Sequence, residues 1–298
     1  MWLIASFTSY FLNAIALVVD KALLKRSIPE PVTYAFYVSI LSLFAFFLAP
    51  FGFYWPGFSL ALIGVAAGLS STFALVLLFY SLREGEASRV SPVIGGLVPI
   101  FIFFLAWFLL GEVLTFNQTL SFVMILVGSY LIVRGGISGK TMSKKLFFGM
   151  MASAFLFALS HTFAKYIYVE HTFSSGFIWR AIGTFLGAIF LILPTRNRRI
   201  IFNSFHAVSP KTGSVFIFGQ IAAALAFLLL NYAFTLGPVS ITNALSGVQH
   251  IFVFIFAILL ARSYPQILEE NLTPAMIFRK TISIILIGAG VFLLFLTG

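Results

Sequence analysis

Polar side chains are rare in the long apolar stretches of this sequence, and most of them lie in the second half. His161 and Lys165 are four residues apart, which places both on one face of a helix. A polar group in such a stretch costs free energy unless it meets a partner, a ligand or water. These groups are therefore candidates for binding a small solute. The candidates are Asn13, His161, Lys165, Arg180, Asn231, Asn243, Gln249 and His250.

Each candidate also has a purely structural interpretation. Lys165 could extend its amine to the membrane surface, as long basic side chains do. Arg180 could pair with Glu170 in the adjoining loop. The amide and imidazole side chains could instead join packed helices through hydrogen bonds. Both interpretations stay open for every candidate.

The residue types do not indicate an enzyme. A nucleophile needs a nearby base and an orienting carboxylate, and zinc needs clustered His, Cys or acidic ligands. The chain has no cysteine, no Gly-rich nucleotide loop and no metal-like spacing of its 4 histidines. We predict no catalytic residue, no metal and no cofactor. No acidic residue is embedded in the middle of an apolar stretch. Those nearest to such stretches lie near their ends: Asp20, Glu84, Glu86, Glu112 and Glu170.

Composition indicates that the solvent of this chain is lipid. Of its 298 residues, 61% are hydrophobic and 9% are charged, and the mean hydropathy is +1.08. The net charge of +10 would suggest nucleic acid in a soluble protein. In a membrane protein, basic loops are explained by topology, so no nucleic-acid partner is expected.

Ten segments are long and apolar enough to cross a bilayer as helices, which need roughly 20 residues. Proline residues separate most of them. We therefore predict an all-α membrane protein. The predicted spans are 2–19, 32–49, 58–82, 90–110, 115–134, 146–168, 174–193, 213–236, 239–261 and 277–297.

The basic residues predict how the chain is oriented. Sixteen of the 18 Lys and Arg residues lie in or beside the connections that follow the odd-numbered spans; the exceptions are Lys165 and Arg180. The positive-inside rule makes that side cytoplasmic and places both termini outside.

The two halves of the chain resemble each other. Ser9 to Lys21 pairs with Ser153 to Lys165 at a spacing of 144 positions. Tyr80 pairs with Tyr232, and Gly128 with Gly288, in the same order along the chain. Five helices are an odd number, so the second copy enters the membrane from the opposite side. We predict two inverted five-helix repeats, residues 1–139 and 140–298, around a central cavity.

A family resemblance is carried by the stretch from about residue 75 to 135. Its motifs are Tyr80-Ser-Leu-Arg-Glu-Gly-Glu-Ala-Ser and the run from Pro99 that ends in Gly111-Glu112. They resemble the drug/metabolite transporter superfamily, specifically its EamA-like ten-helix members. The resemblance implies a central cavity between the halves and solute export in many members. Members are commonly drawn with both termini in the cytoplasm, opposite to the charge count.

Small and kinked positions suggest flexibility or close packing. Pro99 lies inside the fourth span after two glycines, so it is a candidate hinge or a static kink. Gly64-xxx-Gly68 and Gly183-xxx-Gly187 fit close helix packing, within the bundle or between subunits. A monomer and a homodimer are both compatible with these motifs.

Together these features predict a multi-pass protein of the cell's inner or plasma membrane. Its expected function is secondary transport or export of a small metabolite by alternating access. The lack of an embedded carboxylate favours a neutral, zwitterionic or anionic solute, and protons are a candidate coupling ion through His161 or His250. The alternatives are a flippase for a lipid-linked sugar or phosphate-bearing lipid, and a membrane-embedded lipid-modifying enzyme.

Overall fold

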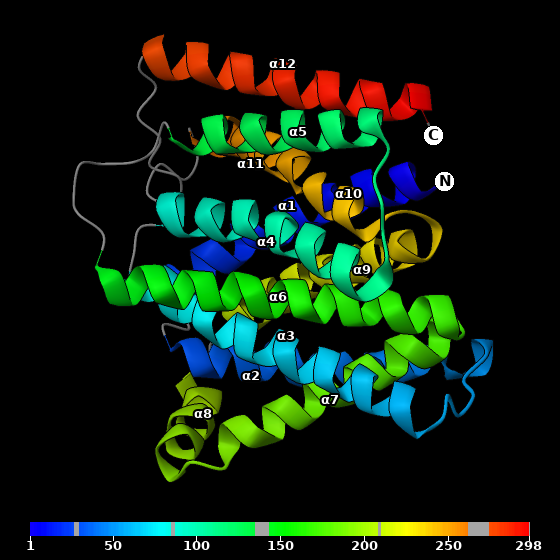
Figure 1. The fold of residues 1–298 in the computed structure, drawn as a ribbon. Coiled ribbons are helices and arrows are strands. Elements are labelled where there is room, and N and C mark those ends of the chain that lie inside the picture. The colour runs from blue at the N-terminus through cyan, green and yellow to red at the C-terminus, as the bar shows by residue number, and fades with distance from the viewer. Residues whose placement is uncertain (27–29, 85–86, 135–142, 208–209, 262–273, 298) are drawn as a thin grey trace.

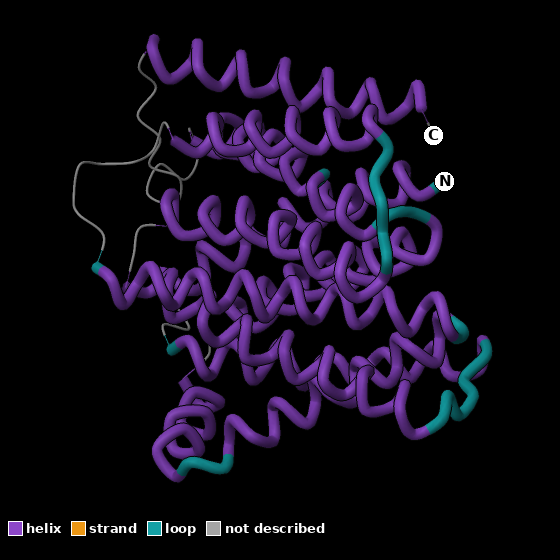
Figure 2. The backbone as a smooth tube through the Cα atoms, in the orientation of Figure 1, coloured by secondary structure: helices purple, strands orange, loops and turns teal. Residues whose placement is uncertain are grey.

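A computed structural model describes residues 1–26, 30–84, 87–134, 143–207, 210–261 and 274–297. Within these ranges every regular element is a helix and no strand occurs (Figures 1 and 2). The helices are α1 (Trp2–Arg26), α2 (Pro31–Leu41), the 3-10 helix η1 (Ser42–Phe51), α3 (Phe58–Glu84), α4 (Ala87–Leu110), α5 (Phe116–Arg134), α6 (Lys144–Glu170), α7 (Phe173–Ile192), α8 (Thr195–Ala207), α9 (Pro210–Leu236), α10 (Val239–Ala244), α11 (Ser246–Ala261) and α12 (Pro274–Thr297).

Helices cover the predicted spans, which confirms an all-helical protein in the described part of the chain. Seven helices among the described residues are long and apolar enough to cross a membrane, and two shorter apolar helices cover 116–131 and 281–296. The ten-span count remains a prediction. The predicted boundary between the halves, at residues 139 and 140, lies outside the described residues.

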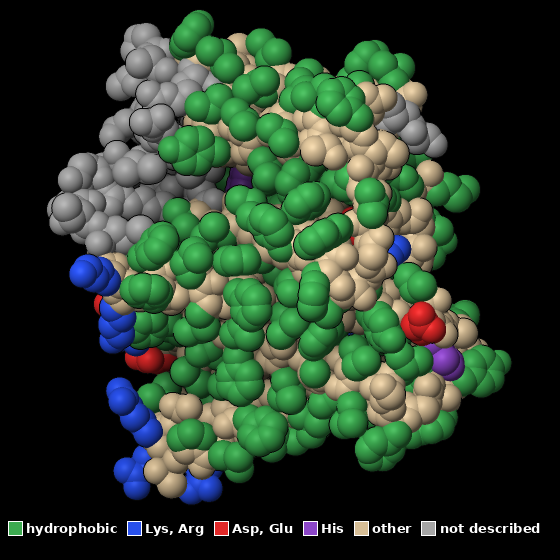
Figure 3. Space-filling view, viewed as in Figure 1, with side chains coloured by type: hydrophobic (Ala, Val, Ile, Leu, Met, Phe, Trp, Pro, Cys, Tyr) green, Lys and Arg blue, Asp and Glu red, His purple; other side chains and the backbone are tan. Residues whose placement is uncertain are grey.

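The two ends of the molecule differ in charge. Lys and Arg side chains gather along one end, at the left edge of Figure 3. Both termini lie at the opposite end, where α1 begins and α12 finishes (Figure 1). Basic residues therefore mark the end away from the termini, as the charge count predicts.

One helix was not expected from the sequence. The predicted connection after residue 193 contains α8, which carries Arg196, Arg198 and Arg199 on its exposed side. Its buried Ile201 faces the bundle, and Ser204 shares a hydrogen bond of 2.7 Å with Tyr37 of α2. The segment was missed because its basic residues mask a short amphipathic pattern.

Helices from the two halves pack in matching pairs. α1 lies along α9, and α6 lies along α3. Ser9 Oγ of α1 donates to Ala226 O of α9 at 2.6 Å. Ser153 Oγ of α6 donates to Ala74 O of α3 at 2.8 Å. The same serine-to-carbonyl bond thus joins both helix pairs, at positions that the sequence pairing relates.

The packing of α5 against α12 is reciprocal as well. A methyl group added at Gly128 would lie 2.9 Å from Ser283 O, and one added at Gly290 would lie 3.0 Å from Ser121 O. Gly128 and Gly290 are 162 positions apart, and so are Ser121 and Ser283. This packing pairs Gly128 with Gly290, two residues beyond the Gly288 that the sequence pairing suggested. Apolar helices have weak sequence register, whereas a close contact fixes the register directly.

The glycine motifs of α3 and α7 pack against each other inside the bundle. A methyl group at Gly68 would lie 2.1 Å from Arg180 O, and one at Gly183 would lie 2.2 Å from Val65 O. Thr72 Oγ1 also donates to Thr184 O across this contact, at 3.1 Å. Of the two interpretations of the glycine motifs, packing within the bundle accounts for both, so they give no argument for a dimer.

We expect Gly68→Ala to destabilise the protein, because its methyl group would force the α3 and α7 backbones apart. Overpacking of this kind costs about 1–3 kcal/mol. The measurement is the thermal unfolding midpoint of purified protein in detergent. The control is Gly288→Ala, since Gly288 is exposed and an added methyl group meets nothing within 4 Å. Equal midpoints for the two variants would contradict the close contact.

Candidate functional site

The ninth predicted span, 239–261, is not a single helix. α10 ends at Ala244, Leu245 forms a turn, and α11 begins at Ser246. The Val248 amide donates to Leu245 O at 2.9 Å, which closes the turn between the two helices. A break inside a membrane helix changes the direction of the side chains on either side and leaves backbone groups free to bond elsewhere.

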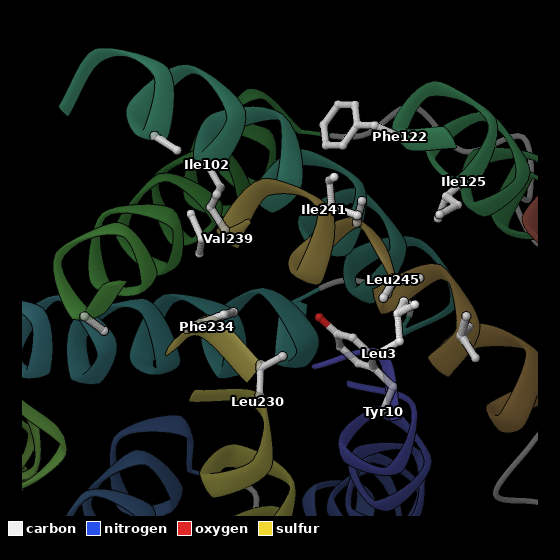
Figure 4. Close-up of a cluster of buried hydrophobic side chains, with 14 of the residues drawn as sticks. Leu3, Tyr10, Ile102, Phe122, Ile125, Leu230, Phe234, Val239, Ile241 and Leu245 are labelled. Carbon is white, nitrogen blue, oxygen red and sulfur yellow. The ribbon is translucent and has the colours of Figure 1, made fainter. Parts of the chain in front are cut away.

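Side chains from both halves of the chain surround this break. Tyr10 reaches from α1 toward α10, where Ile241 and Leu245 pack into the same apolar cluster (Figure 4). The Tyr10 hydroxyl donates to Thr242 O at 2.8 Å. Packed side chains from α1, α10 and the turn at Leu245 therefore form one apolar cluster at the break.

Two amide-containing pairs lie on either side of the break, and we call them the central polar pairs. Asn13 Nδ2 of α1 donates to Gln249 Oε1 of α11 at 2.9 Å. His161 Nδ1 of α6 lies 2.9 Å from Asn243 Oδ1 of α10. Four of the predicted site residues are thus brought together in two hydrogen bonds. The first bond joins α1 to α11, and the second joins α6 to α10.

The hydrogen bonds of Asn243 determine the tautomer of His161. Asn243 Nδ2 donates to Val239 O at 2.9 Å, so Asn243 Oδ1 is the atom that faces the imidazole. An amide oxygen only accepts, so Nδ1 of His161 carries the proton and Nε2 is left as an acceptor. The imidazole also lies against Phe234, with ring centroids 5.4 Å apart.

His250 and Pro99 take no part in the central polar pairs. His250 Nε2 lies 3.4 Å from the position that a methyl group on Gly95 of α4 would occupy. Within the described part of the chain, the His250 imidazole makes no hydrogen bond. Pro99 is buried inside α4, which continues unbroken from Ala87 to Leu110. Its role as a hinge stays a prediction.

A second group of polar side chains surrounds Arg180, and we call it the arginine cluster. Arg180 is 1% exposed, and its Nη1 donates to Asn231 Oδ1 of α9 at 2.5 Å. Its Nη2 donates to Ser160 Oγ of α6 at 2.9 Å. Tyr168 Oη donates to the same Asn231 oxygen at 2.9 Å, and Phe227 lies 4.4 Å from the guanidinium carbon.

The proposed ion pair between Arg180 and Glu170 does not form. Glu170 is exposed at the end of α6, whereas the guanidinium is enclosed by neutral groups. Among the described residues, no carboxylate lies within ion-pair distance of Arg180. Its Nε also has no hydrogen-bond partner there. The structure therefore holds a buried cation whose charge is not neutralised by the described part of the chain.

Lys165 holds the end of α9. Its Nζ donates to Phe234 O at 2.5 Å and to Gly237 O at 3.0 Å. These are carbonyl groups from the last turn of α9 and the residue that follows, where the helix dipole is negative. The structure adds a third interpretation of Lys165 to solute binding and extension to the membrane surface. The amine caps the end of a helix.

Glu112 caps the next helix. Its Oε2 accepts from Val239 N at 2.9 Å, and its Oε1 accepts from Ser240 N at 3.1 Å. These are the first two amides of α10, where the helix dipole is positive. Gly111, with φ of +63°, ends α4 in a left-handed conformation that favours glycine. The Gly-Glu motif therefore links the end of α4 to the start of α10.

A pocket of about 360 Å³ lies beside these two capped helix ends. It is at the end of the molecule opposite the basic residues, and it presents one amine and two carboxylates among apolar side chains. We call it the end pocket. Its lining residues are Leu109, Leu110, Glu112, Lys165, Tyr166, Val169, Glu170 and Pro238.

Sequence reasoning missed several residues of these groups. Glu112, Tyr168 and Ser160 were not candidates, because their roles depend on partners that lie on helices distant in the sequence. Asp20 was expected near a helix end, but α1 continues to Arg26. Asp20 therefore belongs to the body of α1, and its carboxylate accepts hydrogen bonds from the Tyr34 hydroxyl and the Gln220 amide.

No site for a metal is evident: among the described residues, no three His, Cys, Asp or Glu side chains gather closely enough to hold an ion.

Comparison with known proteins gives two findings. Residues 1–134 match the model of the EamA-like transporter family. This confirms the resemblance to the drug/metabolite transporter superfamily over the first half of the chain. The match and the apolar helices together support a protein that crosses a membrane. No protein of curated function matches this chain in sequence.

Twenty-seven chains of solved structures match this one. One of them, described only as the crystal structure of a protein, is 18% identical with a TM-score of 0.67. The match covers 99% of this chain and 96% of the other. At this identity the likeness concerns the fold alone, and it extends over both halves.

We expect Glu112→Gln to lower the thermal unfolding midpoint, because it removes the charge that complements the α10 dipole. Such a charge contributes about 0.3–1 kcal/mol, and up to about 2 kcal/mol where it is partly buried. The control is Glu170→Gln, which changes an exposed carboxylate of the same end pocket. A loss of stability in the control and not in Glu112→Gln would show that the cap has no stabilising role.

Proposed function

We propose, from the match of residues 1–134 to the EamA-like transporter family, that this chain is a secondary transporter of a small metabolite. The observation that carries the proposal is the meeting of polar side chains from both halves at the break between α10 and α11. Binding sites of secondary transporters form where repeats meet and where a helix is interrupted. The central polar pairs satisfy both conditions.

The proposal includes two inverted five-helix repeats, residues 1–139 and 140–298. The serine-to-carbonyl bonds of Ser9 and Ser153 support it, because they connect positions that the sequence pairing relates. The reciprocal contacts of α5 and α12 support it independently. α1 also begins at the end of the bundle opposite to the start of α6 (Figure 1). An axis in the membrane plane would relate the two copies.

Alternating access follows from this arrangement. The central polar pairs join α1 and α6 to the broken helix, so they hold the closed conformation together. Opening toward one side requires one pair to separate, and a bound solute would supply the hydrogen bonds that are lost. Binding and opening would then be coupled, because the solute stabilises the open conformation.

The chemistry of the two repeats differs more than their frames do. At the spacings of 144 and 152 positions, Ser160 and Asn231 correspond to Ala16 and Phe79. His161 corresponds to Leu17. The polar side chains of the second repeat therefore take the places of apolar ones in the first. A solute that uses these groups would bind asymmetrically, mainly to α6, α7, α9 and α10.

Two other functions are compatible with part of the structure. A flippase for a phosphate-bearing lipid would use the basic groups, and the amine of the end pocket would suit a headgroup. Flipping a lipid needs a path open to the bilayer. A lipid-modifying enzyme is a weaker proposal, since none of the described groups combines a nucleophile, a base and an orienting carboxylate.

The remaining parts of the proposal concern location and assembly. We place the protein in the inner or plasma membrane, with its basic end in the cytoplasm and both termini outside. The topology commonly drawn for EamA-like members is the reverse, with both termini in the cytoplasm. The partners are the bilayer and a small solute, and the chain acts as a monomer or a homodimer.

The function is tested by identifying a solute and measuring its movement. Purified protein is screened for thermal stabilisation by amino acids, nucleosides, sugar phosphates and aromatic metabolites, because a ligand stabilises the folded state. A compound that raises the midpoint is then tested for uptake into liposomes that contain the protein. Stabilisation by a compound that is never taken up, while a short-chain fluorescent lipid is flipped, would favour the flippase.

We expect Asn13→Ala to reduce uptake of that solute by about tenfold, because the bound solute would lose its hydrogen bond to this amide, and a buried polar group left without its partner costs roughly 1–3 kcal/mol. The change removes the donor to Gln249 and leaves the backbone of α1 intact. The control is Asn117→Ala at the exposed start of α5. Equal uptake by both variants would separate the central polar pairs from transport.

If protons are the coupling ion, His250 is the group we expect to carry them, since an imidazole changes charge near neutral pH. Its side chain is not engaged by a described hydrogen bond, whereas His161 is bonded to Asn243. His250→Ala should make uptake independent of pH between 5.5 and 8, whereas wild-type uptake should vary. A variant that keeps the wild-type pH profile would exclude His250 as the proton carrier.

A further inference from the structure

The arginine cluster has a positive charge and no negative one. Arg180 is 1% exposed and lies within α7, one of the apolar helices long enough to span a membrane. Its described partners are an amide oxygen, a hydroxyl and an aromatic ring, all uncharged. A buried cation is stabilised far better by an anion than by neutral dipoles. The positive charge of the cluster is therefore not neutralised by the described residues.

The unused hydrogen-bonding capacity of Arg180 is suited to an oxyanion. The guanidinium has five N–H donors, and Nε has no partner among the described residues. Nη2 is held by the Ser160 hydroxyl, whose own proton goes to Ala67 O at 2.6 Å. A carboxylate or phosphate could bind Nε and Nη2 together by displacing a single hydroxyl contact. This two-point geometry is the preferred way for arginine to bind oxyanions.

The fold itself does not require these polar groups. Ser160 and Asn231 correspond in the first repeat to Ala16 and Phe79, which are apolar. Phe79 is buried there against Tyr34, with ring centroids 4.8 Å apart. An aromatic ring thus occupies the place in the first repeat that the Asn231 amide occupies in the second. The polar cluster of the second repeat is an addition that the packing of helices does not explain.

Aromatic rings surround the guanidinium and indicate what the rest of the ligand resembles. Phe227 lies over the guanidinium at 4.4 Å, and Phe177 lies 5.7 Å from Phe227. Phe173 continues this row, 5.4 Å from Phe177 and 5.3 Å from Tyr168. An apolar or aromatic body would pack favourably against such a row.

We infer that Arg180 is the binding residue for an oxyanion group on the transported solute, which is an organic anion with an apolar or aromatic body. This inference rests on the proposed transport function and narrows the solute from neutral, zwitterionic or anionic to anionic. Asn231 and Ser160 hold the guanidinium in place while the site is empty. The anion replaces the Ser160 contact and supplies the missing negative charge.

The experiment compares probes that share a phenyl ring and differ in charge. Benzoate and phenyl phosphate carry an oxyanion, and benzamide is the neutral control. Binding is measured as the shift in thermal unfolding midpoint of the purified full chain at about 10 mM probe. Dioctanoyl phosphatidic acid is a fourth probe, which distinguishes a lipid phosphate from a free one. The variants are Arg180→Gln, Arg180→Lys and Arg198→Gln, the last altering an exposed arginine of α8 as a control.

We expect benzoate or phenyl phosphate to raise the midpoint of wild type and Arg198→Gln by about 2 °C or more, and benzamide to leave it unchanged. Arg180→Gln should lose the shift. Arg180→Lys keeps a charge and is the second variant in case the glutamine form does not fold. It should bind at least tenfold more weakly, because an ammonium cannot form the two-point contact.

Three results would overturn the inference, and the first two are benzamide stabilising wild type as much as the anions do and the Arg180 variants keeping the full anion shift. The first result needs no variant and so does not depend on folding. A shift with phosphatidic acid but with neither water-soluble anion would also overturn it, in favour of a lipid.

Transport is measured separately, as uptake of radiolabelled phenyl phosphate into liposomes. Anion binding through Arg180 without uptake would leave the site standing and contradict the transport function. Uptake of a neutral solute by Arg180→Gln would support the transport function and contradict the role of Arg180 in solute binding.

Discussion

Polar groups in a hydrocarbon environment must find their partners inside the protein, and this constraint explains most of the contacts between helices here. The junction of α9 and α10 is the clearest case. The helix ends lie on either side of Gly237 and Pro238, and both would leave unpaired backbone groups in an apolar setting. Lys165 takes the carbonyls of one end, and Glu112 takes the amides of the other. Each charge has the sign that the helix dipole favours.

The short α10 depends on this junction. A six-residue helix has little stability of its own, because few of its backbone hydrogen bonds are internal. It is held at its start by Glu112, along its side by Tyr10 and at its end by the turn at Leu245. The central polar pairs lie on either side of that turn. The same contacts that allow the helix to be broken therefore position the groups that we propose as the binding site.

The proposed repeats would share one helix frame and differ in side chains, which would explain how a single polar site can arise in a duplicated chain. The helix pairs α1 with α9 and α6 with α3 use the same serine-to-carbonyl bond, so the frame is shared. In the proposed second repeat, Ser160 and Asn231 take the places that Ala16 and Phe79 have in the first. A buried charge of this kind costs stability unless a ligand compensates it, so binding and stability are linked at Arg180.

The sequence alone determined the helical class, the approximate helix boundaries, the separation of charge between the two ends and the set of buried polar residues. These follow from composition and apolar run length, which are local properties.

The tertiary structure decided how those residues combine. Spacing along the chain could not predict that Asn13 meets Gln249 or that His161 meets Asn243, because these partners are more than 80 positions apart. It also could not separate Glu112 from an ordinary loop acid or detect the break at Leu245, since both depend on contacts between distant helices. The polar residues were visible in the sequence, but only packing divided them into helix caps, central pairs and a cation with no counter-ion among the described residues.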